Sequence, residues 1–282
     1  MKKILVVLDW LTSNSVLVDS LMFLNENDDI EVNLLTIVKE TEPTQPFPDE
    51  VHRKAVLNAE RVMNDLKMHL EANSIYVASI QVSDASVADA VCVAVNDCKL
   101  DMALCIANHA DGLAGIFEGT ADKIAHEAPC PVIFVKEGYP LSSFQRLLVA
   151  VSHDNHCEEV LEKAVAFANN YNSSLCVLNI LEPSKSLVSA SGIQGDAYQE
   201  AAVKEHRETI NILLNKLDTH KLNTSTIVIP GDYSEKIVQV SSEINAGVTI
   251  MGKSGSSLLS RIFCGGDGRA AMRNADNPVM IV

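Results

Sequence analysis

The chain has 282 residues, of which 47% are hydrophobic and 21% are charged, and its net charge at pH 7 is −15. This composition excludes a disordered, collagen-like or fibrous protein, and the length suits two domains of about 150 residues each. The negative charge also argues against a nucleic-acid partner, because a protein that binds DNA or RNA needs Lys and Arg to neutralise the phosphate backbone.

Neither the apolar runs nor the cysteines indicate a membrane or secreted protein. No apolar run approaches the roughly 20 residues that a membrane-spanning helix needs, and the opening Met1-Lys2-Lys3 leads into only five apolar residues before Asp9. The seven cysteines form no CxxC pair, which is typical of reduced, mostly buried thiols. We therefore expect a cytoplasmic protein with no membrane partner.

The first half of the chain alternates short apolar runs with longer segments of helical period. Continuous apolar runs are typical of strands that are buried on both faces of a parallel sheet. The predicted strands lie near 3–8, 31–38, 75–82, 101–107 and 131–135. The predicted helices lie near 13–25, 49–72, 86–98 and 119–128.

The second half of the chain repeats the first. Residues 3–8 return as 146–151 and residues 131–135 return as 278–282, at offsets of 143 and 147, which indicates a tandem duplication. The strands of the second copy are predicted near 146–151, 174–181, 223–230, 247–252 and 278–282. Its helices are predicted near 156–171, 196–220, 233–245 and 266–275.

Each copy is therefore predicted to be an α/β domain with a doubly wound five-stranded parallel sheet, and the two tandem domains span 1–141 and 142–282. In such a sheet the ligand crevice lies at the carboxyl ends of the strands. The first domain contains 10 basic and 22 acidic residues, and the second contains 12 and 15. An anionic ligand is thus expected to prefer the second domain.

A glycine pattern follows the fourth predicted strand of the second domain, at Gly252, Gly255, Gly265 and Gly266. Glycines there leave backbone N–H groups accessible and allow positive φ, and the last pair opens a predicted helix whose N-terminus favours anions. Lys253 and Ser254 add a positive charge and a hydroxyl donor. The pattern fits a phosphate cradle and, equally well, a turn that only connects a strand to a helix.

The same segment also matches the P-loop pattern GxxxxGK[ST] at residues 247–254. A true P-loop would make Lys253 the phosphate-binding lysine of an ATP-hydrolysing enzyme. The residues between the two glycines, 248–251, are apolar or β-branched and form the predicted strand itself. We therefore interpret the match as coincidental, and keep weak ATP hydrolysis as an alternative.

The Gly-x2-Gly-x9-Gly spacing after this strand, followed by 277–282, resembles the ATP-binding branch of the universal stress protein family. The turn at 230–237 and Cys130-Pro131-Val132 carry the same resemblance, which covers essentially the whole chain twice. It implies an adenine nucleotide alpha hydrolase-like fold in each domain and ATP, with Mg²⁺, as the ligand. In the family the signature is Gly-x2-Gly-x9-Gly-(Ser/Thr), and its glycines bind the phosphates and ribose of ATP. An Asp that ends the first strand contacts the nucleotide.

Carried over to the second domain, the resemblance implies a nucleotide site formed by Val151, Ser152, Asp154, Met251, Gly252, Lys253, Ser254, Gly255, Gly265 and Gly266. Two positions depart from the family: Ser152 stands where Asp is expected, and Gly266 where Ser or Thr is expected. Asp154 is a candidate replacement for the missing Asp. The loss of one hydroxyl donor costs roughly 1.5 to 3 kcal/mol, which weakens nucleotide binding without abolishing it.

The first domain shows the reverse departures. It keeps Asp9, Gly119 and Thr120, but Ile106 and His109 stand where the first two glycines are expected. Side chains at those two positions would fill the volume that a phosphate needs. We therefore interpret the first domain as structural, with a degenerate nucleotide site.

One cluster belongs to this sequence and not to the family signature: His153, Asp154, His156 and Cys157 follow the first strand of the second domain. These side chains are of the types that hold Zn²⁺ or another transition metal. The alternative is structural: Asp154 or Asn155 caps the next helix and Cys157 packs inward. A metal ion or a small hydrophobic molecule is thus an alternative ligand.

The sequence has no recognisable catalytic nucleophile motif, so we predict a stress-response binding and regulatory module without catalytic residues. Its expected partner is an adenine nucleotide. The strands that begin with Pro131 and Pro278 are expected at sheet edges. If these two strands pair with each other, the two domains form a pseudo-dimer, and a homodimer of chains is also expected. His206 and His220 are expected at the surface of a long polar helix.

Overall fold

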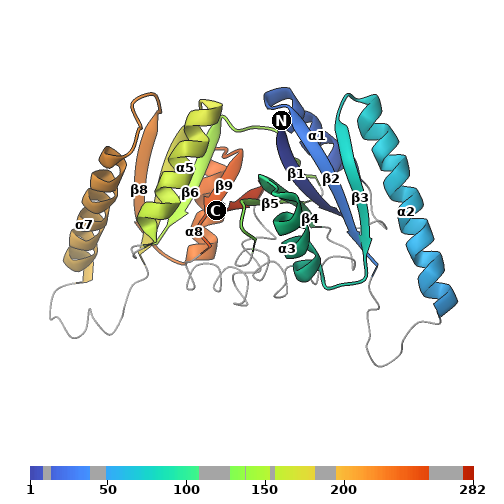
Figure 1. The fold of residues 1–282 in the computed structure, drawn as a ribbon. Helices are drawn as coiled ribbons and strands as arrows, with labels where there is room; N and C mark the ends of the chain where they lie inside the picture. Colours follow the sequence, from blue (N-terminus) through green and yellow to red (C-terminus); the bar gives the residue numbers. More distant parts are fainter. Residues whose placement is uncertain are drawn as a thin grey trace. The chain divides into compact units, whose positions relative to one another are not determined.

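A computed structural model describes residues 1–8, 14–38, 49–107, 128–136, 138–152, 156–181, 195–253 and 276–282. The chain divides into two compact units, Met1–Ser142 and Ser143–Val282 (Figure 1). Both units are built of parallel strands connected by helices, so the predicted α/β fold class is confirmed.

In the first unit, five parallel strands lie in the order β3-β2-β1-β4-β5. The strands are β1 (Lys2–Leu8), β2 (Ile30–Ile37), β3 (Tyr76–Ser83), β4 (Met102–Ala107) and β5 (Val132–Lys136). The described helices are α1 (Ser15–Asn27), α2 (Asp49–Ala72) and α3 (Val87–Cys98). The chain steps outward from β1 to β3 and then returns to β4, so right-handed crossovers place α1 and α2 on one face of the sheet and α3 on the other.

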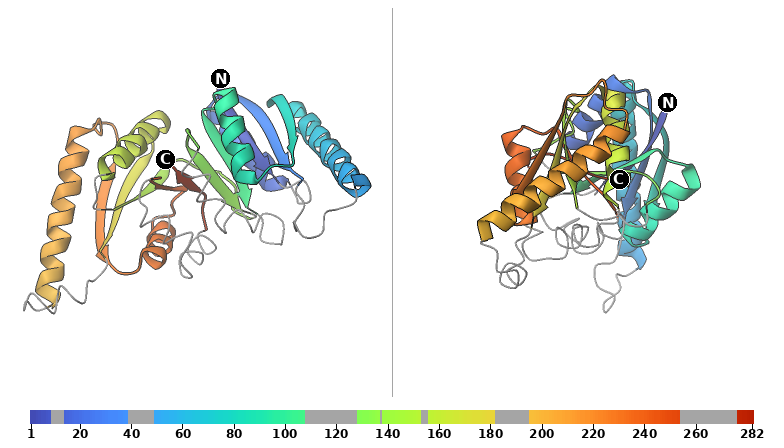
Figure 2. Two further views of the ribbon diagram at one scale, coloured as in Figure 1. Left: turned by 60° about the horizontal axis from the view of Figure 1, so that its bottom comes forward. Right: turned by 90° about the vertical axis from the view of Figure 1, so that its left-hand side faces the viewer.

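The second unit repeats this topology, with parallel strands in the order β10-β9-β6-β7-β8. The strands are β6 (Arg146–Val151), β7 (Ser174–Leu181), β8 (Thr224–Pro230), β9 (Val248–Met251) and β10 (Val279–Ile281). The described helices are α5 (Cys157–Tyr171), α7 (Gly195–Lys216) and α8 (Tyr233–Glu243). Figure 1 shows α5 in front of its sheet, and Figure 2 shows the same helices from two further directions.

The central strands β1 and β6 form the core of their units. Residues 4–8 and 147–151 are at most 3% exposed. Both faces of each strand are thus covered, which explains why the sequence there is continuously apolar and does not alternate. Burial along the whole strand also fixes the position of its carboxyl end, where the next loop begins.

The long helix predicted at 196–220 ends earlier than expected, at Lys216. Asp218 and Thr219 have low helix propensity, and the Asp218 carbonyl accepts a hydrogen bond from Asn169 Nδ2 at 2.8 Å. His220 is exposed, as expected, but it lies in a turn and not on the helix. The helices predicted at 119–128 and 266–275 fall outside the described residues, apart from Ala128.

Five of the seven cysteines have described side chains, and none of these five forms a disulfide. Cys105, Cys130, Cys157 and Cys176 are buried. Burial, together with the nearby Cys130, raises the pKa of Cys105 to about 12, so this thiol stays protonated at neutral pH. Among the helices of the described ranges, none is long and apolar enough to cross a bilayer.

A buried hydroxyl group connects α1 to the end of the first unit. Ser20 is fully buried. Its Oγ donates a hydrogen bond to the Val16 carbonyl at 2.7 Å and accepts one from the Leu141 N–H at 2.9 Å. This single side chain therefore satisfies a backbone donor 121 residues away in the sequence.

We expect Ser20→Ala to destabilise the first unit by about 1–3 kcal/mol, because the Leu141 N–H would be buried without its acceptor. Urea unfolding followed by circular dichroism measures this loss. Thr209→Ala is the matched control: it removes a hydroxyl that donates within one exposed helix, and its effect should stay within about 0.5 kcal/mol. Equal unfolding midpoints for Ser20→Ala and the wild type would contradict the long-range role of this hydroxyl.

Candidate functional site

The carboxyl ends of β6 and β9 bring two parts of the predicted nucleotide site together. The two strands pair in parallel, with Ala150 opposite Met251. Val151 with Ser152 at the end of β6, and Gly252 with Lys253 directly after β9, therefore lie at the same edge of the sheet. The remaining predicted residues lie outside the described part of the chain: Asp154, Ser254, Gly255, Gly265 and Gly266.

Gly252 lies where α5 packs against the end of β9. A Cβ built at this glycine would overlap Val160 Cγ2, and Val160 is a buried residue of α5. The helix can thus approach the strand this closely only because residue 252 has no side chain. Close packing by itself explains the glycine here, and this packing role was not found from the sequence.

The backbone groups next to Gly252 complete the β9–β10 ladder. The Lys253 N–H donates to the Val282 carbonyl at 3.0 Å, and the Val282 N–H donates to the Met251 carbonyl at 2.9 Å. The Lys253 N–H is therefore already used in a hydrogen bond of the sheet. A phosphate cradle in this loop has to rest on the amides of residues 254–266, which lie outside the described residues.

The structure of β9 is not compatible with a P-loop at residues 247–254. Residues 248–251 are β9, all four are buried, and the strand pairs with both β6 and β10. A P-loop has to wrap its backbone around phosphates, whereas this segment is extended and its backbone forms ladders on both sides. The structure confirms that the GxxxxGK match is coincidental.

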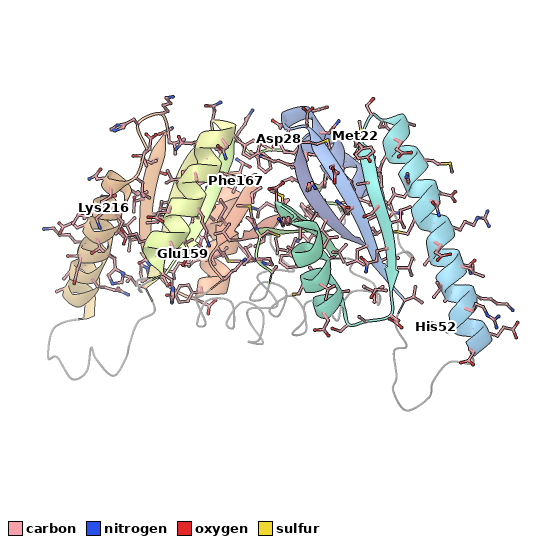
Figure 3. The ribbon with its side chains drawn as sticks, in the orientation of Figure 1. Met22, Asp28, His52, Glu159, Phe167 and Lys216 are labelled. Carbon is pink, nitrogen blue, oxygen red and sulfur yellow. The ribbon has the colours of Figure 1, made fainter. Side chains whose placement is uncertain are left out.

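Charges of both signs lie near the start of α5. Glu158 and Glu159 occupy the first turn of the helix, and Figure 3 shows Glu159 at the opposite end of α5 from Phe167. Lys163 Nζ donates to Glu159 Oε1 at 2.7 Å. This bond lowers the pKa of Glu159, and electrostatic interactions with His156 and Lys253 lower it further. An anion beside Lys253 would thus meet a carboxylate as well as an ammonium group.

The predicted metal cluster falls partly outside the described residues, where His153 and Asp154 lie. Of its other members, His156 is exposed and Cys157 is buried. Within the part of the chain that the structure describes, no three His, Cys, Asp or Glu side chains gather as metal ligands do. The predicted capping role of Asp154 or Asn155 also falls outside the described residues, and the side chain of His156, directly before α5, makes no capping hydrogen bond.

The first unit places Ile106 at the position that Gly252 holds in the second. Val7 pairs with Cys105 on β4 in the same way that Ala150 pairs with Met251 on β9. Residue 106 is still part of β4, whereas β9 has already ended at the equivalent position. The other predicted residues of this degenerate site lie outside the described ranges: Asp9, His109, Gly119 and Thr120.

Two residues that were not predicted from the sequence as site residues are linked by hydrogen bonds to the end of β6. Asn179 on β7 donates from Nδ2 to the carbonyl of Val151 at 2.8 Å. His206 Nδ1 on α7 lies 2.8 Å from Asn179 Oδ1, so the expectation that His206 is a surface residue is wrong. Its spacing of four residues from the buried Ile210 was the available signal.

The model of the universal stress protein family matches residues 1–136 and again residues 143–282. The chain belongs to the universal stress protein family. Two family domains in tandem account for the two units with one topology. A search of curated protein sequences found no significant match.

Several solved structures have a similar fold over nearly the whole length. A universal stress protein from Archaeoglobus fulgidus DSM 4304 is 18% identical with a TM-score of 0.69, and the match covers 98% of this chain and 95% of that one. A protein of unknown function from Pseudomonas aeruginosa PAO1 is 16% identical with a TM-score of 0.61, covering 100% and 92%. A putative universal stress protein from Pseudomonas aeruginosa UCBPP-PA14 is 16% identical with a TM-score of 0.60, covering 100% and 93%. These matches show that the tandem fold occurs in other proteins.

We expect Gly252→Ala to destabilise the second unit by about 1–3 kcal/mol, because the new Cβ would overlap Val160. Val160→Ala removes the methyl groups in the way. The double variant should therefore lose less stability than the two single variants together, with a coupling of about 0.5–3 kcal/mol in urea unfolding. Val165→Ala, at another buried position of α5, is the control and should combine additively with Gly252→Ala. Additive losses for the Gly252 and Val160 pair would contradict the packing role.

Proposed function

We propose that this universal stress protein binds an adenine nucleotide, ATP with Mg²⁺, in its second unit and acts as a binding and regulatory module. The observation that carries this proposal is the parallel pairing of β6 and β9. It brings Ser152 and Lys253, which are 101 positions apart in the sequence, to one edge of the sheet. In doubly wound sheets this edge is where ligands bind.

The described residues fit the phosphate end of a nucleotide in part. Lys253 supplies an ammonium group and Ser152 a hydroxyl group, and both are suited to phosphate oxygens. The remaining donors would be the amides of Gly255, Gly265 and Gly266, which the family pattern implies, with Asp154 in place of the family's Asp. The Mg²⁺ ion would reduce the charge that the triphosphate presents to Glu158 and Glu159.

The contrast between the units supports the second as the nucleotide-binding one. At the equivalent strand end the first unit carries Ile106 instead of glycine. Its net charge of −12, against −3 in the second domain, also opposes a polyphosphate. We propose that the first unit has a structural role.

A cytoplasmic, stress-responsive role belongs to the same proposal. The cysteines with described side chains form no disulfide, which suits a reducing compartment. The homodimer stays a prediction from the sequence.

Isothermal titration calorimetry with ATP and Mg²⁺ tests the proposal. The wild type should bind, and Gly255→Val should lose binding because its side chain would fill the expected phosphate space. Lys253→Gln should weaken binding by about three- to tenfold, the size of a charge-assisted contact at a partly exposed site. Glu159→Gln should strengthen it by about two- to fivefold by removing a nearby negative charge, and both charge effects should shrink in high salt.

Glu162→Gln is the matched control for Glu159→Gln. It makes the same change at an exposed position of α5, three residues after Glu159. Its effect on the Kd should stay below about twofold. An absence of heat with wild-type protein, at concentrations that reveal micromolar binding, would overturn the proposed function.

A further inference from the structure

The carbonyl of Val151 ends the central strand of the second unit, and a side chain holds it in place. Asn179 is 1% exposed and lies opposite Val151 in the β6–β7 ladder. Its Nδ2 donates to the Val151 oxygen at 2.8 Å. The Val151 carbonyl and the Ser152 N–H belong to one planar peptide group. Holding that oxygen therefore sets the direction in which the chain leaves the sheet towards the nucleotide site.

The hydrogen bond from Asn179 to Val151 also determines which atoms donate and which accept between Asn179 and His206. A backbone carbonyl only accepts, so the amide nitrogen of Asn179 has to face Val151, and its Oδ1 faces α7. His206 Nδ1 lies 2.8 Å from this oxygen. An amide oxygen also only accepts, so the imidazole carries its proton on Nδ1 and donates. The result is a directed chain of two hydrogen bonds, from His206 through Asn179 to the end of β6.

The position of His206 on its helix suits this role. His206 precedes the buried Ile210 by four residues and Leu214 by eight, so it lies on the face of α7 that packs against the sheet. It is half-buried, where a hydrogen bond is less exposed to competition from water. Without this donor the buried Oδ1 of Asn179 would lose a hydrogen bond, and the amide could rotate away from Val151.

The first unit holds the equivalent carbonyl by a simpler contact. Thr36 on β2 is fully buried, and its Oγ1 donates to the Leu8 carbonyl at 2.9 Å. Leu8 and Val151 occupy the same place in the repeat, as do Thr36 and Asn179. A threonine presents a single hydroxyl group, whereas an asparagine also buries a carbonyl that needs a donor. The choice of Asn179 in the second unit thus creates the requirement that His206 meets.

We propose that His206 is a positioning residue of the nucleotide site: through Asn179 it fixes the Val151–Ser152 peptide at the edge where the ligand binds. This inference deepens the function proposed above and rests on it. His206 acts through Asn179 and the end of β6, and it is not assigned a contact with the nucleotide.

Two substitutions of similar size separate positioning from a general loss of packing. His206→Asn places an N–H at the same number of bonds from the backbone as Nδ1, and His206→Gln places it one bond further. His and Asn also have similar helix propensities. We expect His206→Asn to keep the ATP Kd within about twofold of the wild type, and His206→Gln and His206→Leu to weaken it about tenfold, the cost of a buried acceptor without its donor.

A second test replaces Asn179 with threonine, the residue that the first unit has at the equivalent position, Thr36. Asn179→Thr should keep ATP binding, because a threonine hydroxyl holds the equivalent carbonyl in the first unit. In that background His206→Leu should have no further effect on the Kd, because the group that needs the imidazole has gone. Independent contributions would instead add, and additivity of the two changes would overturn the inference.

Hydrogen exchange of peptides covering 151–157, measured without nucleotide, separates this inference from the proposed function. Exchange should be faster in His206→Leu than in the wild type and should return to the wild-type rate in His206→Asn. If the wild type binds no ATP, the proposed function fails, and this exchange pattern still tests the hydrogen-bond chain. Equal exchange in all three proteins, or an equal ATP Kd for the wild type and His206→Leu, would overturn the inference.

Discussion

The parallel pairing of β6 with β9 is the constraint on which the second unit depends. It aligns the ends of two strands that are far apart in the sequence, so that Ser152 and Lys253 emerge at one edge. The same pairing brings the end of β9 against α5, where only a glycine fits beside Val160. Packing and the proposed binding site thus require the same residue type at position 252. A substitution there tests both roles, and only the coupling to Val160 separates them.

The duplicated units show how one backbone supports different chemistry. Each unit holds the last carbonyl of its central strand with a side chain from the neighbouring strand, Thr36 in the first and Asn179 in the second. The asparagine adds a dependence on His206 in α7. A helix that is distant in sequence from β6 is thereby connected to the start of the loop at Ser152. The two units therefore share a topology but differ in what positions that loop.

The fold was largely predictable from the sequence because its central strands are buried on both faces. Continuous apolar runs such as 147–151 locate the strands within one or two residues, and the repeat supports each assignment twice. Contacts between elements were not predictable in this way. The partner of His206 lies 27 residues away on another element, and the role of Gly252 depends on a helix that begins 95 positions earlier. The sequence placed Ser152 and Lys253 after the first and fourth strands of the second domain, as the structure does, but it did not indicate the residues that support those strand ends.

We propose that an adenine nucleotide binds at the carboxyl ends of β6 and β9 and not in the first unit. Photolabelling with 8-azido-ATP, followed by mass spectrometry of tryptic peptides, identifies the unit that binds the nucleotide. We expect labelling within 147–163 or 237–261 that excess ATP suppresses. Labelling confined to residues 1–141, or labelling that ATP does not suppress, would contradict it.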